Sequence, residues 1–421
     1  MKVSSRDIML SVITGDALGT PLEGMGKGHI ASCFGSLSGF TDPEPALRGR
    51  MERWKKPGLY SSISQFMLLL TASRDRRGRC VDAFARLMAS SPALAASGYG
   101  IFRNTDEAEA GFIAASREQR QTAAQAPLVS SRIIAALAPL SLDGLPLPDL
   151  LEETVRFLRL FTSDLKTIAA GLLHTSIIDA LARGGRTPRA AVDCAAALLD
   201  CIPGDCSARV FASGVNPDAL AGEVRTLGDL FSLLRDCDSL RAAEDIICSH
   251  LNRSLKNRIT RATVNLPAAL LPFAVSFVSL HGEDGDLLYR AAAEGGSSAS
   301  FTAIVASLAA SARGTAVAPD DLLQGLVNRK RIVSLVDSLA AGASSPSIAE
   351  EFIRSEASLS AKAEEELRAR TRHGRKKPEK KAPTRAGREQ ALARHVVESW
   401  TKLDKAKWKK ERKQRGEKDE P

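Results

Sequence analysis

Apolar residues recur at helical spacing along most of the first 340 residues. In residues 6–18, Ile8, Met9, Val12 and Ile13 fall on one face, which predicts a helix. Residues 62–74 have almost no polar face, which predicts a buried helix. The same pattern predicts helices over 82–88, 107–117, 130–138, 150–160, 167–183, 189–199, 226–235, 240–255, 268–280, 286–293, 300–312 and 320–339. Alternating strand patterns are almost missing, so the chain is predicted to be all-α.

Composition agrees with a large helical core. The 421 residues are 44% apolar but only 5% aromatic, which favours close-packed helices over a β-sandwich. The most apolar stretch, 266–280, contains Pro267 and Pro272 and is too short to span a membrane. The start has no apolar run of signal-peptide length, and the seven cysteines show no disulfide spacing. We therefore expect a cytoplasmic protein without a transmembrane segment.

Charge divides the chain into a neutral body and a basic tail. Residues 361–421 hold 21 Lys and Arg against 11 Asp and Glu, whereas residues 1–360 hold 37 against 38. Within the tail, residues 390–415 can form a basic helix with a narrow apolar stripe through Leu392, Val396, Trp400 and Leu403. Such a helix suits nucleic acid or an acidic protein, with a membrane surface or a solubilising extension as alternatives.

The predicted domain organisation follows these changes in composition. Residues 1–342 form the globular body. Residues 343–388 comprise a Ser/Pro linker, a charged helix candidate and a Lys/Pro-rich stretch, and are expected to be partly disordered. Residues 389–421 form the basic amphipathic helical tail.

Three short segments carry a family resemblance. They are Gly15-Asp16-Ala17-Leu18-Gly19, Tyr60-Ser61-Ser62-Ile63-Ser64-Gln65 and Gly295-Gly296-Ser297-Ser298-Ala299-Ser300. They resemble the signatures of the ADP-ribosylglycohydrolase family, whose second and third segments read Tyr-Thr-Asp-Asp-Thr-Gln and Gly-Gly-Asp-Thr-Asp-Thr. The resemblance covers roughly residues 1–340. It implies an all-α ADP-ribosylglycohydrolase-like domain, and a pair of divalent cations, usually Mg²⁺, held against ADP-ribose.

The aspartates of these signatures are missing from this chain. Ser62, Ile63, Ser297 and Ala299 stand at the positions of the lost metal ligands. Two Mg²⁺ ions close together repel each other, and a cluster of carboxylates makes such a pair tenable. A serine offers one neutral oxygen, and Ile63 and Ala299 offer none. The sequence therefore predicts a pseudoenzyme that holds no Mg²⁺ cofactor.

Three acids remain as candidates for catalysis: Asp16, Glu23 and Asp164. Each also has a structural interpretation, since Asp16 can satisfy a helix end, Glu23 can cap a loop, and Asp164 can cap the helix that follows it. The candidate ligand-binding residues are Glu23, Gly24, Ser61, Ser62, Ser64, Gly295, Gly296, Ser297, Ser298 and Ser300. Their hydroxyls and helix N-terminal N–H groups suit a nucleotide such as ADP-ribose, and neutral drift after loss of catalysis is the alternative.

Three functions stay open at this point. The first is a pseudoenzyme of the family, with ADP-ribose or a related nucleotide as its candidate ligand. The second is an active ADP-ribosyl hydrolase with an altered Mg²⁺ site. The third is a nucleic-acid-associated or scaffold protein that acts through its basic tail.

Overall fold

The computed structural model describes residues 4–48, 50–91, 94, 100–118, 126–142, 144–184, 187–198 and 215–374. The first compact unit spans Met1–Ala369 and the second Arg370–Pro421. Over the described ranges every regular element is a helix, and the one β-bridge joins Gly26 and Gly295. The all-α fold expected from the hydrophobic pattern is confirmed.

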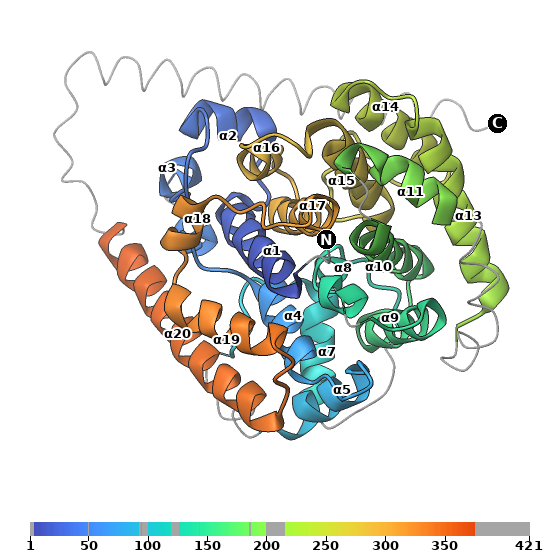
Figure 1. Ribbon diagram of the computed structural model, residues 1–421. Coiled ribbons are helices and arrows are strands. Elements are labelled where there is room, and N and C mark those ends of the chain that lie inside the picture. The colour runs from blue at the N-terminus through green and yellow to red at the C-terminus, as the bar shows by residue number, and fades with distance from the viewer. Residues whose placement is uncertain are drawn as a thin grey trace, which may run out of the picture. The chain divides into compact units, whose positions relative to one another are not determined.

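The helices are coloured along the chain in Figure 1. The α-helices up to residue 184 are α1 (Ser5–Gly19), α2 (Lys27–Phe34), α3 (Glu44–Leu47), α4 (Ser62–Ala72), α5 (Val81–Ser90), α7 (Glu107–Arg117), α8 (Arg132–Ala135), α9 (Leu147–Phe161) and α10 (Leu165–Gly184). The later ones are α11 (Ala191–Leu198), α13 (Pro217–Leu234), α14 (Leu240–Leu251), α15 (Pro267–His281), α16 (Leu287–Ala293), α17 (Ser298–Arg313), α18 (Asp320–Gly325), α19 (Arg329–Ala340) and α20 (Pro346–Gly374). Four 3₁₀ turns add Thr20–Leu22, Met51–Arg53, Ala138–Leu142 and Pro188–Ala190.

Helices α1 and α17 pack against each other at the centre of the first unit (Figure 1). Two glycines on α1 allow this close approach. A Cβ added at Gly15 would lie 2.8 Å from the carbonyl oxygen of Thr302, and one at Gly19 would lie 2.3 Å from that of Ser298. The Gly-Asp-Ala-Leu-Gly segment thus brings the end of α1 directly onto the start of α17.

Helix α10 is long and apolar enough to cross a membrane by length and composition alone. In the structure it packs against α9, α13, α15 and α17, and 72% of its apolar window is buried. It is therefore a buried core helix of the first unit.

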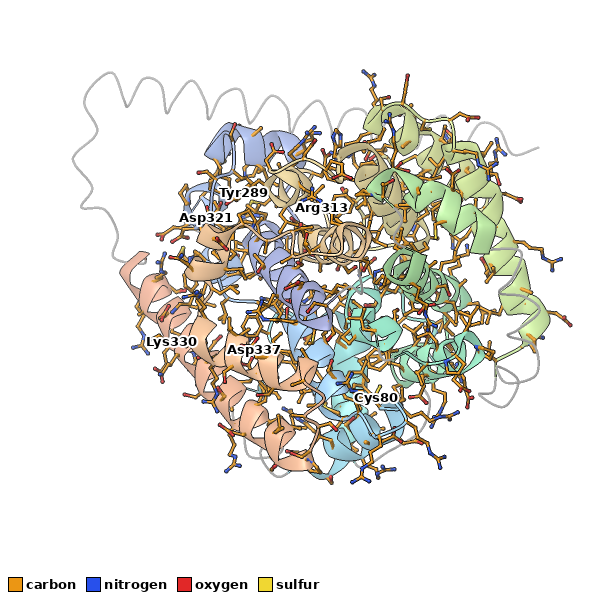
Figure 2. The ribbon with its side chains drawn as sticks, viewed as in Figure 1. Cys80, Tyr289, Arg313, Asp321, Lys330 and Asp337 are labelled. Atoms are coloured by element: carbon orange, nitrogen blue, oxygen red, sulfur yellow. The ribbon has the colours of Figure 1, made fainter. Side chains whose placement is uncertain are left out.

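One helix predicted near the C-terminal part differs from the structure. The helix predicted over 320–339 is divided into α18 and α19, because Asn328 adopts a left-handed conformation with φ of 62°. A hydrogen bond of 3.0 Å from Tyr289 to Asp321 ties α16 to α18 (both residues are labelled in Figure 2).

Helix α20 belongs to the first unit up to Ala369, whereas the sequence placed the end of the body at residue 342. Phe352 and Ile353 are buried, and the carboxylate of Glu356 is buried with them. Glu356 accepts hydrogen bonds from Tyr60 (2.7 Å) and Gln65 (2.8 Å). The charged helix candidate expected within residues 343–388 is therefore, up to Ala369, part of the first unit rather than of a linker.

Some predictions fall outside the described residues. These are the Lys/Pro-rich stretch from residue 375 to 388 and the basic tail 389–421. Among the described cysteines, Cys33, Cys237 and Cys248 are free thiols, while Cys201 and Cys206 lie outside the described ranges.

Candidate functional site

The three family-like segments meet in space. We call the region where the end of α1 meets the first residues of α4 and α17 the α4–α17 junction. Its residues are Asp16, Glu23, Ser61, Ser62, Ile63, Ser64, Ser297, Ser298, Ala299 and Ser300, together with Arg132 and Glu109, whose side chains are bonded to it.

Asp16 is a buried cap for the N-terminus of α4. Its Oδ1 accepts hydrogen bonds from the hydroxyls of Ser61 (2.6 Å) and Thr20 (3.0 Å). Its Oδ2 accepts from the backbone N–H of Ser61 (2.9 Å), the N–H of Ser64 (3.1 Å) and the Ser64 hydroxyl (2.6 Å). A carboxylate offers about four lone-pair sites, so these five donors occupy its acceptor capacity.

Glu23 has a similar role at α17. Its Oε2 accepts a hydrogen bond of 2.8 Å from the backbone N–H of Ala299, in the first turn of that helix. A carboxylate is stabilised there by the unpaired N–H groups and by the helix dipole. Asp16 and Glu23 thus both hold helix N-termini, which matches the structural interpretation of Asp16, whereas Glu23 was expected to cap a loop.

Two glycines shape the turn that leads into α17. Gly295 and Gly296 have φ values of 70° and 69°, a region that strongly favours glycine. A Cβ at either position would also lie 2.2 Å from a carbonyl oxygen, that of Met25 or of Thr263. The turn is further bound to the loop after α1 by hydrogen bonds of 2.8 Å between Gly24 and Gly296 and between Gly296 and Met25. The family-like frame is therefore maintained by backbone packing, independently of any ligand.

Arg132 brings a positive charge into the junction. Its Nη2 donates to the hydroxyls of Ser61 (2.6 Å) and Ser62 (2.9 Å), and its Nε donates to Oε2 of Glu109 (3.0 Å). The side chains of Arg132 and Glu109 are 5% and 0% exposed, so this is a buried ion pair. The guanidinium is thus bonded to Ser62, which stands where the family has its first aspartate.

Glu109 is tied into the same network by its capping position on α7. It accepts from the Ser62 hydroxyl (2.7 Å) and from the backbone N–H of Asp106 (2.9 Å), which closes a capping box. Burial raises the pKa of Glu109 to about 7, although Arg132 acts to lower it. Burial also acts to lower the pKa of Arg132, but the carboxylates of Glu109, Glu23 and Asp16 raise it overall. The guanidinium therefore remains charged.

The serine hydroxyls of the junction are directed into the protein. Ser61, Ser62, Ser64, Ser298 and Ser300 are 0–1% exposed, and Ser297 is 7% exposed. The first three are bonded to Asp16, Glu109 or Arg132, and Ser298 donates to the Ala292 carbonyl (3.2 Å). These hydroxyls are buried, and that of Ser300 has no hydrogen-bond partner among the described residues. Their role as ligand-binding residues stays a prediction.

Of the remaining sequence candidates, Gly24 is exposed and Glu23 is half-buried. Asp164 caps α10: it accepts hydrogen bonds from the backbone N–H (2.8 Å) and the hydroxyl (2.6 Å) of Thr167. These local bonds match the interpretation of Asp164 as a helix cap. Among the described residues, its hydrogen bonds do not reach the junction.

The residues of the junction do not fit a pair of Mg²⁺ ions. Such a pair needs several oxygen ligands with negative charge. The lone pairs of Asp16 are already taken, Glu23 has one carboxylate oxygen bound to α17, and Ile63 and Ala299 offer no side-chain oxygen. The Arg132 guanidinium adds a fixed positive charge that would repel a cation.

Sequence reasoning missed Arg132 and Glu109. The signal for the arginine was its place at the start of an otherwise apolar segment, Arg132-Ile133-Ile134-Ala135-Ala136, where a buried cation needs a partner. The signal for the glutamate was the Asp106-x-x-Glu109 capping box. Neither signal identifies the residue to which the side chain is bonded.

Together, the helical fold, the glycine turns and the α4–α17 junction define a helical hydrolase-like protein. A sequence profile described as ADP-ribosylglycohydrolase matches residues 4–348. The chain therefore belongs to the ADP-ribosylglycohydrolase family, a typically metal-dependent group.

Solved structures support the same fold. One, described as an ADP-ribosylglycohydrolase-related protein complex, is 17% identical to this chain with a TM-score of 0.50. The match covers 81% of this chain and 99% of that chain. A comparison with curated proteins finds no match.

Proposed function

We propose that this protein is a non-hydrolytic member of the family, in which the junction has become part of the folded core. The observation that carries the proposal is the Arg132 guanidinium, bonded to Ser61, Ser62 and Glu109. It supplies a permanent positive charge beside Asp16 and Glu23, where a metal-dependent relative would need exchangeable cations. The protein then acts through its surfaces rather than through hydrolysis.

The alternative of an active hydrolase with an altered Mg²⁺ site is less well supported. The catalytic candidates Asp16 and Glu23 are both engaged at helix N-termini, and Glu109, the third acid of the junction, is paired with Arg132. A reader of ADP-ribose that uses the hydroxyls of Ser61, Ser62, Ser64 and Ser298 would have to break the bonds that these hydroxyls already make. Both alternatives predict binding of ADP-ribose, so binding distinguishes them from the proposal.

Calorimetric titration of ADP-ribose into the full-length protein, with Mg²⁺ and then with a chelator, tests the proposal. We expect no Mg²⁺-dependent binding, because the guanidinium and the loss of four carboxylates oppose cation binding. Binding that requires Mg²⁺ would support the hydrolase and contradict the proposal. Binding that the chelator leaves unchanged would support a metal-free reader instead.

We also propose that the surface through which the protein acts includes the basic tail. Residues 375–421 hold 17 Lys and Arg against eight Asp and Glu. A run with this net charge of +9 suits nucleic acid phosphates or an acidic protein, and we place this activity in the cytoplasm.

A chain that ends at Gly374 keeps all of α20 and removes the tail. We expect the full chain to bind nucleic acid with an affinity that falls steeply between 50 and 200 mM salt, on the order of 10³-fold for six phosphate contacts. The shortened chain should lose this binding, as measured by fluorescence anisotropy with single- and double-stranded probes. Equal binding by both chains would exclude the tail.

A further inference from the structure

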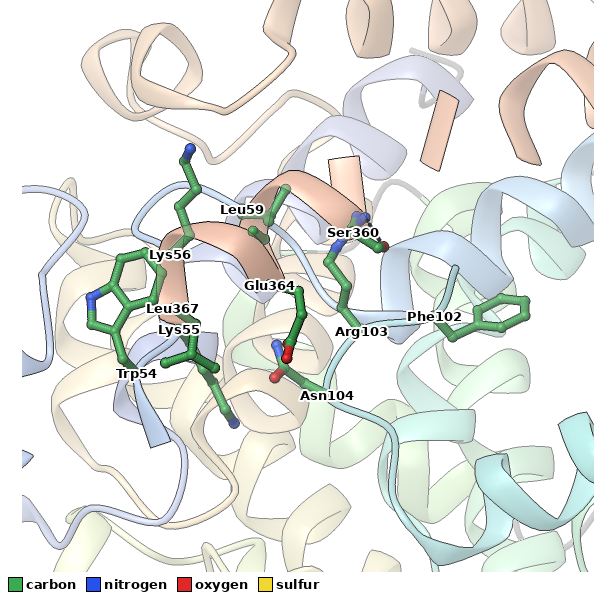
Figure 3. A pocket seen from close by; sticks show the side chains of 11 residues that line it. Trp54, Lys55, Lys56, Leu59, Phe102, Arg103, Asn104, Ser360, Glu364 and Leu367 are labelled. Carbon is green, nitrogen blue, oxygen red and sulfur yellow. Dashed lines mark hydrogen bonds between the residues drawn. The ribbon is translucent and has the colours of Figure 1, made fainter. Parts of the chain in front are cut away.

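A small cleft is lined by residues that are not members of the α4–α17 junction, although its Lys55 interacts electrostatically with Glu23, Asp16 and Arg132 of the junction. It is lined by residues 54–56 and 59, by residues 102–104 and by one side of α20, and its volume is about 190 Å³ (Figure 3). At roughly 30 Å³ for each water, this is room for about six water molecules, and it is below the 300–1,000 Å³ typical of drug-sized ligands. The cleft suits a small group rather than a whole dinucleotide.

Most charges around this cleft are paired. Lys56 binds Glu366 (2.6 Å), and Arg103 binds Glu356 (2.5 Å). Glu364, the acid that lines the cleft, binds Arg368 one turn further along α20 (3.2 Å). These three pairs account for two of the three cationic side chains in the wall and for its carboxylate.

Lys55 is the cation that remains. Among the described residues its ammonium has no hydrogen bond or ion pair. In Figure 3 its side chain runs away from that of Lys56, so the two amines do not share a partner. Burial lowers the pKa of Lys55, against the raising effect of Glu23. A poorly solvated, unpaired ammonium costs free energy, which a bound anion would offset.

Asn104 adds a neutral donor to the same cleft. Its φ of 55° is left-handed, which asparagine tolerates better than most residues. Among the described residues its side-chain amide has no hydrogen-bond partner, and it lines the cleft together with Lys55. An ammonium and an amide in one small cleft match the acceptor oxygens of a phosphate group.

We propose that this cleft binds a phosphate-type oxyanion, free or as the phosphate of a nucleotide, with Lys55 as its counter-charge and Asn104 as a second donor. The wall formed by α20 lies beyond residue 348, where the family match ends, so the site belongs to this chain's own extension. The proposal does not depend on the non-hydrolytic function proposed above.

Trp54 lines the cleft and provides the readout. The chain has three tryptophans, and Trp400→Phe with Trp408→Phe leaves Trp54 as the only one in the full-length protein. Titration of this variant with inorganic phosphate, pyrophosphate and AMP is expected to give a saturable change in Trp54 fluorescence. Tighter binding of AMP than of phosphate would indicate that the cleft binds the phosphate group of a nucleotide. Tighter binding of phosphate than of AMP would indicate that it binds a free oxyanion.

Substitution of Lys55 tests the assignment. Lys55→Met should weaken binding roughly tenfold or more, the scale of one lost charge-assisted hydrogen bond. Asn104→Ala should weaken it less, by about fivefold, as expected for a neutral donor. The matched control is Lys330→Met, which removes the same charge from an exposed position (Figure 2) and should leave binding unchanged. Thermal melting checks that each variant is folded.

Two results would overturn the proposal. One is the lack of saturable binding for all three anions in the parent protein. The other is binding by the folded Lys55→Met and Asn104→Ala variants that is as tight as binding by the parent protein. That result would place any bound anion elsewhere, for example on the basic tail.

Discussion

Replacing Arg132 with methionine is expected to lower the free energy of unfolding by about 3–5 kcal/mol. The variant keeps most of the side-chain volume but leaves the buried carboxylate of Glu109 without its cation. It also removes a donor from the hydroxyls of Ser61 and Ser62, which have no access to water in the folded state. Urea denaturation followed by far-ultraviolet circular dichroism measures the change.

The double variant Arg132→Met with Glu109→Gln separates charge from packing. It removes both charges, so we expect it to regain much of the stability lost in the single variant, about 2 kcal/mol or more. The control is Arg331→Met, because Arg331 and its partner Glu351 are 45% and 72% exposed. An exposed pair contributes about 0–1 kcal/mol. If Arg132→Met lowered the free energy of unfolding no more than Arg331→Met does, the Arg132 guanidinium would not be what stabilises the junction.

Replacing Glu356 with alanine has the second large expected effect, also about 3–5 kcal/mol. Glu356 is fully buried and is the counter-ion of Arg103, whose side chain is 8% exposed. It also accepts hydrogen bonds from Tyr60 and Gln65, the residues on either side of the segment Ser61–Ser64. Its loss would leave three buried donors with a cavity between them.

The control for Glu356 lies on the same helix. Glu351→Ala removes an exposed carboxylate from α20 and should change stability by about 0–1 kcal/mol. If Glu356→Ala behaved like Glu351→Ala, α20 would be only an accessory to the fold. The expected contrast would instead establish that this extension beyond the family match helps to hold the junction in place.

Much of the fold could be predicted because apolar periodicity reports burial directly. The helix predicted over 107–117 has the bounds of α7, and those predicted over 167–183 and 268–280 end within two residues of α10 and α15. These segments owe their helical state to a continuous apolar face, which is a local property of the sequence.

The C-terminal boundary could not be predicted in this way. The buried face of α20 includes Glu356 and Ser360, which look like solvent-facing residues in the sequence. Their partner Arg103 lies about 250 residues earlier, and no local pattern encodes that contact. The structure therefore extends the body well past residue 342.

The junction was predictable in its frame but not in its chemistry. The glycine turns and the two surviving acids could be placed together because three motifs resembled one family. The position of Arg132 could not be predicted, because this residue is separated from Ser61 by 71 residues and belongs to none of those motifs. The loss of the aspartates is visible in the sequence, whereas the residue bonded in their place is visible only in the structure.

The most direct test of the central claim is a titration of Mn²⁺, which substitutes for Mg²⁺ at oxygen-ligand sites, into the full-length protein. Electron paramagnetic resonance measures the concentration of free Mn²⁺ during the titration. We predict no stoichiometric high-affinity site, with the same result for the parent and the folded Arg132→Met, Glu109→Gln double variant. Tight binding of one or two Mn²⁺ ions by the parent protein, reversed by Mg²⁺, would contradict the account.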